Sequence, residues 1–580
     1  MSRLPLRLSR FAVLAGVLAL AGAPRGTAAA VFGAMTHFAQ GWNTKLVHRL
    51  TAAGIAHVRD ELYWDTVEPQ PGVFRFPAAY DAYMSALHAA GISPLIELTF
   101  ANPNYDGGHT PYTPAGFAAY ARYATAVLQR YGAQIHAVEV WNEYNGTWCN
   151  GPATADRAGT YTRMLATAYA AIKAARPDVT VVGGATAGLP LPYLERLFAD
   201  GALRSMDAVS IHPYRTDSPP EGLEIQVAAL RQLIDRYAGG RTIPIWVTEI
   251  GWGTHAPAAP GDLDIDRSTQ AKFLVRALTL LASAGVDRTY WYLARDDHNT
   301  PTMGLVNDNR ALTPKLAARA MATLNAQLGN ATFVRREPAA AGIYSLLFHD
   351  PAAGDLRVLW SLHRFTLTVA PETRLTSLYG AAIAPAADGT IVVGDAPVFM
   401  AGLLPALPAA NATGGRVAAE SLSGFSDQQG RNGWSYGAFI GDNVSFVPLA
   451  RYAVTDWNEQ WTDVFPYLSI TAGDQHPSHS GPAPVAAVRR WTSDFAGTVH
   501  VTGRFKCTPH GDGVGVRVLA DGQPLYAADL GGGRSIVGTF DLQPAVRVGT
   551  TLDFVVDPGP AANIDYDATE VSVVVEQLSP

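Results

Sequence analysis

The segment Ala137-Val-Glu-Val-Trp-Asn142 is a short β-rich run, and the longer segment 158–175 after it carries apolar residues at helical spacing. The same unit recurs along the first half of the chain, where 117–131 and 268–284 are further amphipathic helical stretches. The β-rich runs that we expect to be strands are 31–37, 56–60, 94–99, 137–142, 179–183, 208–212, 243–249 and 288–292.

Eight strands separated by helices over roughly 300 residues fit a closed barrel better than an open doubly wound sheet. No glycine-rich dinucleotide fingerprint follows the first strand, which also disfavours a dinucleotide-binding fold. The predicted fold class is therefore α/β, with a (β/α)8 TIM barrel over residues 31–328.

The pattern changes after residue 328 to short, alternating runs separated by turns. They predict a small β-sandwich over 329–404, with strands at 332–337, 343–348, 356–362, 365–369, 375–379, 390–393 and 397–400. Residues 405–415 are rich in small residues and proline and are typical of a linker. Residues 416–580 are again strand-like, and we expect a second, jelly-roll-like β-sandwich there.

The first thirty residues have the pattern of a secretory signal peptide. Arg3, Arg7 and Arg10 precede the apolar run 11–22, and small residues follow up to Ala30. The apolar run is shorter than the roughly 20 residues that span a bilayer, so we expect cleavage after Ala30 and no membrane span. A secreted or periplasmic protein is therefore predicted.

Charge and cysteine content exclude some classes of partner. The formal net charge of −7 gives no electrostatic basis for binding nucleic acid, and we expect a monomer. Cys149 and Cys507, the two cysteines of the chain, fall in different predicted domains, which disfavours a disulfide. Neither cysteine belongs to a metal-binding motif.

Two glutamates end predicted barrel strands. Val138-Glu-Val-Trp-Asn-Glu143 ends the fourth strand and Ile245-Trp-Val-Thr-Glu249 ends the seventh. Catalytic residues of such barrels come from the C-terminal strand ends, so these carboxylates should face each other across the mouth. Glycosidic cleavage needs two such carboxyl groups, one protonated and one ionised, and mutual repulsion and burial separate their pKa values.

These motifs resemble those of clan A glycoside hydrolases. Trp-Asn-Glu143 resembles the acid/base motif and Trp-Val-Thr-Glu249 the nucleophile motif of that clan. Family 39, which includes endoglycosidases of biofilm exopolysaccharides, is the nearest family. The resemblance implies retention of configuration by double displacement, with no cofactor and no metal.

The resemblance also implies roles for residues at other strand ends. Arg59 would lie beneath the nucleophile, Asn142 would bind the 2-hydroxyl of the sugar, and Trp291 would form an aromatic platform. The segment Ser210-Ile-His212-Pro-Tyr214 resembles the one whose His or Tyr contacts the nucleophile.

Four further residues each admit two interpretations. His37 could line the sugar site or be a hydrogen-bonded core histidine, and Asn102 could contact substrate or stabilise a turn. Trp252 is placed either to stack on sugar or to pack in the core. Glu139 is better explained as a buried, paired carboxylate inside the barrel than as a third catalytic acid.

The predicted function is a secreted retaining glycoside hydrolase, acting in the endo mode on a β-linked polysaccharide or exopolysaccharide. One alternative is an exo-acting β-glycosidase such as a β-xylosidase. Another is a non-catalytic carbohydrate-binding matrix protein, which the presence of both glutamates disfavours.

The terminal domain resembles jelly-roll modules of bacterial carbohydrate-active enzymes, so it is expected either to bind carbohydrate or to be a structural appendage. Its aromatic residues include Trp434, Tyr436, Trp457, Trp461, Tyr467 and Trp491. Asp and Asn residues near its end would also suit a structural calcium ion.

Overall fold

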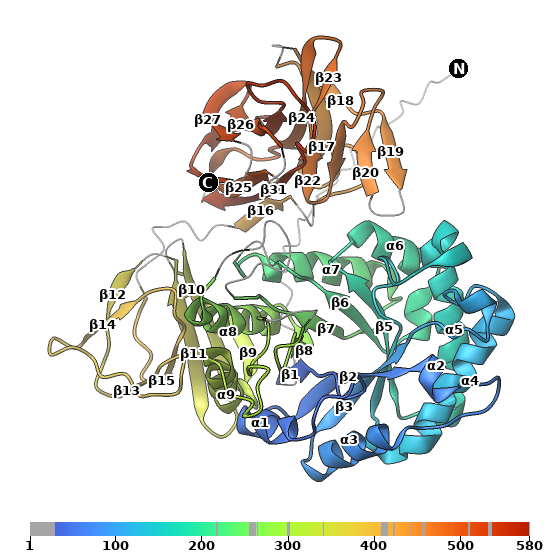
Figure 1. Ribbon diagram of the computed structural model, residues 1–580. Helices are drawn as coiled ribbons and strands as arrows, with labels where there is room; N and C mark the ends of the chain where they lie inside the picture. Colours follow the sequence, from blue (N-terminus) through green and yellow to red (C-terminus); the bar gives the residue numbers. More distant parts are fainter. Residues whose placement is uncertain are drawn as a thin grey trace, which may run out of the picture.

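The computed structural model contains an α/β barrel, a small β-sheet region beside it and a separate β-rich body that ends the chain (Figure 1). It describes residues 29–215, 219–254, 263, 265–298, 302–339, 342–362, 364–407, 416–421, 424–441, 444–454, 459–507, 511–531 and 536–578. The predicted signal peptide up to residue 28 and most of the predicted linker lie outside these ranges, as does Trp457.

Eight parallel strands close into a barrel, as the sequence predicted. β1 pairs with both β2 and β8, which closes the ring. The strands are β1 (Val31–Met35), β2 (His57–Tyr63), β3 (Ser93–Thr99), β4 (Ala137–Val140), β5 (Thr180–Ala187), β6 (Ala208–His212), β7 (Ile245–Ile250) and β8 (Val286–Trp291).

Helices cover the outside of the barrel. They are α1 (Leu46–Ala52), α2 (Trp64–Val67), α3 (Ala78–Ala89), α4 (Pro114–Tyr131), α5 (Arg157–Ala175), α6 (Leu191–Ala199), α7 (Leu223–Tyr237), α8 (Arg267–Ser283) and α9 (Leu316–Leu328). Local sequence fixes several helix starts: the side chain of Thr113 caps α4 by accepting from the Gly116 N–H, and Asp156 caps α5 in the same way.

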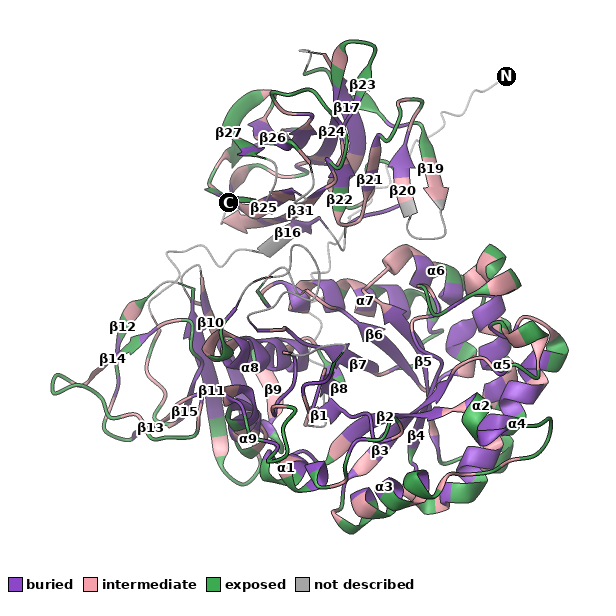
Figure 2. Ribbon diagram, viewed as in Figure 1, coloured by how far each residue is buried: buried purple, intermediate pink, exposed green. Residues whose placement is uncertain are grey.

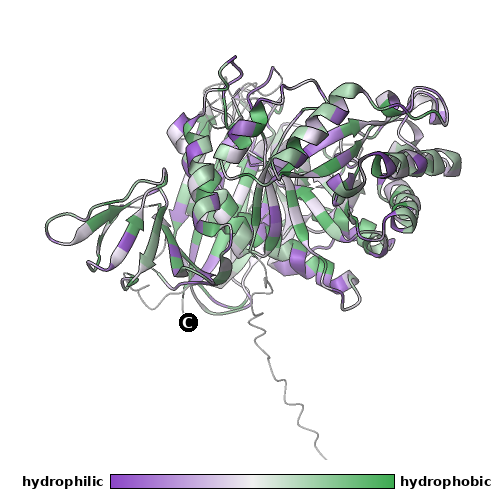
Figure 3. Ribbon diagram, turned by 90° about the horizontal axis from the view of Figure 1, so that it is seen from below, coloured by the Kyte–Doolittle hydropathy of each residue, from purple (hydrophilic) through white to green (hydrophobic). Residues whose placement is uncertain are grey.

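The main core lies between the strands and the inner faces of these helices. The strands and facing helix surfaces are buried while the loops and outer helix faces are exposed (Figure 2). Hydropathy follows the same division, with hydrophobic residues concentrated on the strands and hydrophilic ones on the outer loops (Figure 3). Burial of this apolar surface, at about 25 cal/mol per Å², is the main stabilisation of the barrel.

Antiparallel sheets follow the barrel. A five-stranded and a two-stranded sheet are built from β9 (Thr332–Arg336), β10 (Ile343–Asp350), β11 (Gly354–Ser361), β12 (Phe365–Thr368), β13 (Thr373–Thr376), β14 (Thr390–Val393) and β15 (Val398–Gly402). All seven strands expected here are present.

The C-terminal body consists of two antiparallel sheets with a common core. One sheet contains β16 (Arg416–Glu420), β19 (Arg451–Val454), β20 (Glu459–Thr462), β21 (Ser469–Thr471), β22 (Asp474–His476), β25 (Gly497–Cys507), β28 (Val537–Leu542), β29 (Ala545–Val546) and β31 (Thr569–Leu578). The other contains β17 (Trp434–Ile440), β18 (Val447–Pro448), β23 (Ser478–Ser480), β24 (Ala483–Thr492), β26 (Gly513–Ala520), β27 (Gln523–Gly531) and β30 (Thr551–Asp557).

Cys149 and Cys507 are both buried cysteines. Across the part of the chain that the structure describes, every helix is too short or too polar to cross a membrane.

Candidate active site

Glu143 lies just beyond the end of β4, where the backbone turns sharply. Trp141 and Glu143 have φ angles of 69° and 44°, in the left-handed region that side chains other than glycine rarely adopt. A hydrogen bond of 2.6 Å from the Glu143 N–H to the Ala185 carbonyl holds this turn against β5. The turn leaves the Glu143 carboxylate at the barrel mouth with 21% of its side chain exposed.

Glu249 lies on β7, and both of its carboxylate oxygens are engaged. Oε1 accepts a 2.6 Å hydrogen bond from Arg59 Nη1, and Oε2 accepts one of 2.8 Å from the Tyr214 hydroxyl. Its side chain is 11% exposed. Burial beside Glu249 raises the pKa of Tyr214 well above its ordinary value, so the hydroxyl keeps its proton and donates it.

His212, at the end of β6, lies between the two glutamates. Its Nδ1 is 3.0 Å from Oε1 of Glu143 and 3.8 Å from Oε1 of Glu249. One oxygen of each glutamate and one ring nitrogen of His212 lie within 4.8 Å of one another. The ends of β4, β6 and β7 therefore bring these three side chains to one place.

Arg59 is the centre of a buried charge network below the mouth. Besides Glu249, its guanidinium contacts Glu139 through Nε at 2.6 Å, Glu97 through Nη2 at 2.5 Å and the Asn142 side-chain carbonyl at 3.0 Å. Glu139 is a fully buried, paired carboxylate, as the sequence analysis preferred. Burial, together with the charges of its neighbouring glutamates, raises the pKa of Glu97 well above its usual range.

The surroundings of Glu143 favour its ionised form. Burial alone would raise its pKa, but hydrogen bonds from His212 and Trp148 and the charge of Arg59 outweigh burial and lower it. In the free protein, the proton that an acid catalyst must carry is therefore held more weakly than by an ordinary glutamic acid.

His37, which follows β1, is connected to the residues around Glu249 by contacts through Tyr292 and Tyr214. Its Nε2 is 3.4 Å from the hydroxyl of Tyr292, whose ring packs edge-on against Tyr214. Burial lowers the pKa of His37, but the nearby Glu61 carboxylate at 2.6 Å outweighs burial and raises it. His37 thus lies near the site, one tyrosine removed from the residues around Glu249.

Sequence reasoning missed Tyr292. It lies directly after Trp291, which the family resemblance indicated as the aromatic platform, so the resemblance pointed to the neighbouring residue. Gly251 lets β7 approach this segment, because a side-chain carbon at that position would lie only 2.1 Å from the Tyr292 carbonyl oxygen.

Three of the predicted substrate contacts are buried behind the mouth. Trp291 and Trp252 are at most 1% exposed, stack on each other, and donate to the backbone carbonyls of Met303 and Arg215 respectively. Asn102 is fully buried and donates to the carbonyls of Trp64 and Glu68. In this structure all three stabilise the loops around the site rather than present a surface to a sugar.

Trp148 is the exposed aromatic residue that borders Glu143. Half of its surface is accessible, at 50%, and its ring stacks on Phe100 with centroids 4.8 Å apart and planes 10° from parallel. Because the stacking on Phe100 covers one face, the arrangement presents a supported aromatic surface beside the carboxylate.

Among the described residues, Glu143, His212 and Glu249 are also the three side chains whose donor atoms cluster as metal ligands would. The Arg59 guanidinium, 2.6 Å from Glu249, opposes a second cation at this position. The donor set therefore suits proton transfer and nucleophilic attack better than metal binding.

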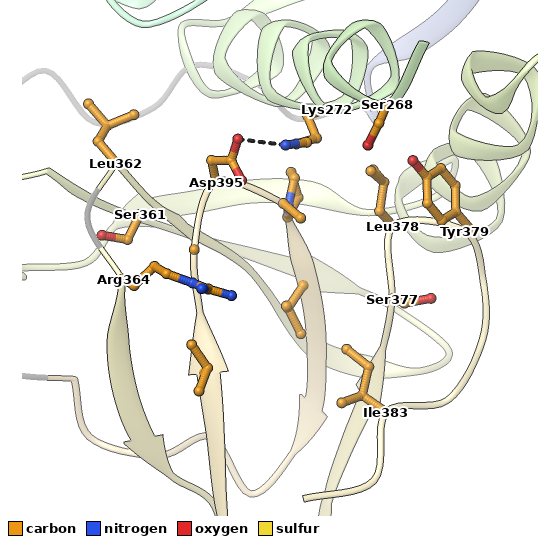
Figure 4. A pocket seen from close by; sticks show the side chains of 15 residues that line it. Ser268, Lys272, Ser361, Leu362, Arg364, Ser377, Leu378, Tyr379, Ile383 and Asp395 are labelled. Atoms are coloured by element: carbon orange, nitrogen blue, oxygen red, sulfur yellow. Dashed lines mark hydrogen bonds and ion pairs between the residues drawn. The ribbon is translucent and has the colours of Figure 1, made fainter. Parts of the chain in front are cut away.

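A cavity of about 520 Å³ lies elsewhere, between α8 and the small sheets (Figure 4). Lys272 of α8 reaches Asp395 across it with an ion pair of 2.7 Å. It contains none of the residues at the barrel mouth, so it is separate from the candidate active site.

A comparison with protein families places both glutamates in a segment that matches a family model. Residues 120–318, which include Glu143 and Glu249, match the family model described as glycosyl hydrolase catalytic core. No curated protein matches the chain.

Solved structures share the barrel. A family 39 glycoside hydrolase from the gut symbiont Bacteroides cellulosilyticus WH2 is 23% identical, with a TM-score of 0.56 over 64% of this chain and 80% of that one. A GH39 β-xylosidase from Caulobacter crescentus is 18% identical, with a TM-score of 0.47 over 65% and 96%. The family 39 enzyme with the TM-score of 0.56 thus shares its fold with this chain.

Proposed function

We propose that this chain, a glycoside hydrolase by its catalytic core, cleaves a polysaccharide with retention of configuration, using Glu143 as acid/base and Glu249 as nucleophile. The observation that carries the proposal is the short separation of the two carboxylates, with one oxygen of each inside a 4.8 Å cluster. Retaining enzymes place their carboxyl groups about 5–5.5 Å apart, whereas inverting enzymes leave about 6.5–9.5 Å for a water molecule.

The surroundings of the two glutamates suit different roles. Arg59 and Tyr214 donate to Glu249, which supports an ionised nucleophile aimed at the anomeric carbon. Glu143 would protonate the leaving oxygen, and in the second step it would take a proton from the attacking water. Since the pKa of Glu143 is lowered, we expect the first step to be fastest on the acidic side of neutrality.

Asn142 would position the sugar. Its side-chain carbonyl already accepts from Arg59, which leaves the NH₂ group to donate to a sugar hydroxyl. Such a contact would favour the transition state if it strengthens as positive charge develops on the sugar.

Endo action on a β-linked polysaccharide or exopolysaccharide is our preferred mode. Trp148 supports it, because a half-exposed aromatic surface beside the acid/base residue suits the flat face of a further sugar unit. The basic and apolar start of the chain supports export as a secreted or periplasmic protein.

Carbohydrate binding by the C-terminal body is a further part of the proposal. Trp434, Tyr436, Trp461 and Trp491 are buried in its core, so they serve packing. Tyr467, which is 72% exposed, is the aromatic residue of the predicted set that could stack on a sugar.

A product screen tests the function. The chain from Val31 onward and its Glu249→Ala variant are incubated with a panel of β-linked plant and bacterial polysaccharides, and products are analysed by mass spectrometry. Oligosaccharides released by the wild type alone support the proposal, and their sizes separate endo from exo action. Following the first-formed anomer by NMR tests retention. Polysaccharide binding without any product, in both proteins, would favour the non-catalytic matrix protein instead.

A further inference from the structure

One end of the C-terminal body holds an acidic side chain, Asp567, whose carboxylate accepts no hydrogen bond from the part of the chain that the structure describes. The loop 558–568 between β30 and β31 meets the turn that precedes β26, which brings Asp565 and Asp567 near Gly511 and Asp512. This place belongs to the C-terminal sheets, not to the barrel mouth, and the proposed hydrolysis makes no use of it.

Asp567 is buried without compensation. Only 1% of its surface is exposed, and no described residue donates a hydrogen bond to either of its enclosed carboxylate oxygens. Burying an ionised carboxylate costs several kcal/mol unless hydrogen bonds or a cation compensate it. Native proteins pair nearly all such groups, so an unpaired one indicates that something else meets it.

Three aspartates of the described chain add negative charge around Asp567. Burial, reinforced by the negative charges of Asp512, Asp565 and Asp557, raises the pKa of Asp567 to about 7. Asp557 is itself paired with a cation, because Arg517 lies 3.2 Å from its carboxylate. The charge balance around Asp567 therefore favours an added cation.

Backbone oxygens converge on the same place. A side-chain carbon at Gly511 would lie 3.1 Å from the Tyr566 carbonyl oxygen, 3.2 Å from Oδ1 of Asp567 and 3.3 Å from the Asp565 carbonyl oxygen. Two backbone carbonyl oxygens and one carboxylate oxygen thus lie together against the backbone of Gly511. Tyr566 has a φ of 67°, so the chain adopts a left-handed conformation within the segment that supplies these oxygens.

We propose that Asp567, with the carbonyl oxygens of Asp565 and Tyr566, binds a calcium ion that ties the loop 558–568 to the turn before β26. A donor set of carboxylate and backbone carbonyl oxygens is what calcium prefers, whereas zinc would require nitrogen or sulfur ligands. Magnesium demands a tighter octahedron and keeps its water, so it fits backbone carbonyls less well. Asp512 and Asp565, both solvent-exposed, add negative charge that attracts the ion.

Calcium titration of the full chain after EDTA treatment and dialysis tests the site. We expect one calcium ion to bind with a dissociation constant of roughly 10⁻⁴–10⁻³ M or lower, the range of extracellular calcium-binding modules. Calcium should also raise the unfolding temperature of the C-terminal body by several degrees, on the order of 5 °C, and magnesium at the same concentration should raise it much less.

Asp567→Asn keeps the shape of the side chain and removes its charge, so it should weaken calcium binding at least tenfold. Asp494→Asn is the matched control. Asp494 is an exposed aspartate in the turn before β25, whereas the proposed site lies near the other end of that strand, where Cys507 pairs with Thr569. This control variant should bind calcium as the wild type does.

If the wild type shows neither binding nor a thermal shift, or if magnesium acts as well as calcium, the proposal is wrong. Equal calcium affinity in Asp567→Asn would overturn it as well. Because the wild-type measurements need no variant, a misfolded mutant does not affect the outcome.

Discussion

His212 and Glu143 are joined by a hydrogen bond of 3.0 Å between Nδ1 of the ring and Oε1 of the carboxylate. On the far side of the ring, Nε2 lies 3.0 Å from the hydroxyl of Thr248, the residue before Glu249. If the Thr248 hydroxyl donates to Nε2, the ring proton must lie on Nδ1 and is donated to Glu143. In that case β7, which carries Thr248 and Glu249, orients the ring that lowers the pKa of Glu143.

Thr248→Val should therefore change the pKa of Glu143 indirectly, through His212. The variant keeps the side-chain volume but removes the hydroxyl, so the His212 proton is no longer fixed on Nδ1. We expect kcat/KM to fall about 10-fold, within the range seen for orienting residues. Loss of the hydrogen bond also raises the pKa of Glu143, so the alkaline limb of the pH profile of kcat/KM moves to higher pH.

The direction of that movement is the decisive readout. In the proposed mechanism, activity requires protonated Glu143 in the first step and is lost as the pH rises through its pKa, which the hydrogen bond lowers. Thr248→Ser retains the hydroxyl and should keep the wild-type profile. An unchanged limb in Thr248→Val would mean that Thr248 does not orient His212.

Glu143→Ala should separate substrates by their leaving groups. Natural polysaccharides have poor leaving groups that need protonation, so their turnover should fall about 10²–10⁴-fold. Activated aryl glycosides should be spared at the glycosylation step, since their leaving groups depart without a proton. Glu249→Ala, in contrast, should abolish the turnover of both, and identical behaviour of the two variants on both substrates would contradict the assigned roles.

Arg59→Met should destabilise the barrel as well as reduce activity. The guanidinium is fully buried against Glu97, Glu139 and Glu249, and its removal leaves these carboxyl groups without their cation. Breaking such a buried pair costs about 3–5 kcal/mol, which denaturant unfolding of the barrel measures. Arg130→Met removes a cation from the exposed pair with Asp81 and should leave the unfolding midpoint unchanged. A wild-type midpoint for Arg59→Met would show that the network does not stabilise the fold.

The alternation of β-rich runs and helical stretches was enough to predict the barrel. All eight barrel strands and all seven strands of the small sheets lie where the pattern placed them, because strand and helix periods differ clearly in these segments. The topology then brought Glu143, His212 and Glu249 together, since parallel strands end at one face of a barrel.

The aromatic residues were harder to predict. Trp252 and Trp291 stand at strand ends, as exposed sugar platforms would, yet they stack on each other beneath the surface. Sequence position gives the strand end but not the direction of the side chain, which depends on loops from other strands. Trp148 shows the converse, because its exposure and its support by Phe100 arise from two loops that are distant in sequence.

Trp148 provides the last prediction, because its ring and its indole N–H have separable roles. Trp148→Ala removes the stacking surface and should raise KM for a polysaccharide up to about tenfold, since aromatic stacking contributes about 0.5–1.5 kcal/mol. KM for a small aryl glycoside should change less. Trp148→Phe keeps a stacking ring but loses the N–H that helps to lower the pKa of Glu143. It should therefore retain most of the polysaccharide affinity while the alkaline limb of the pH profile moves to higher pH. Tyr237→Ala, a change to an exposed aromatic residue on α7, is the control for both measurements. If Trp148→Ala binds polysaccharide as tightly as this control, Trp148 is not part of the substrate surface.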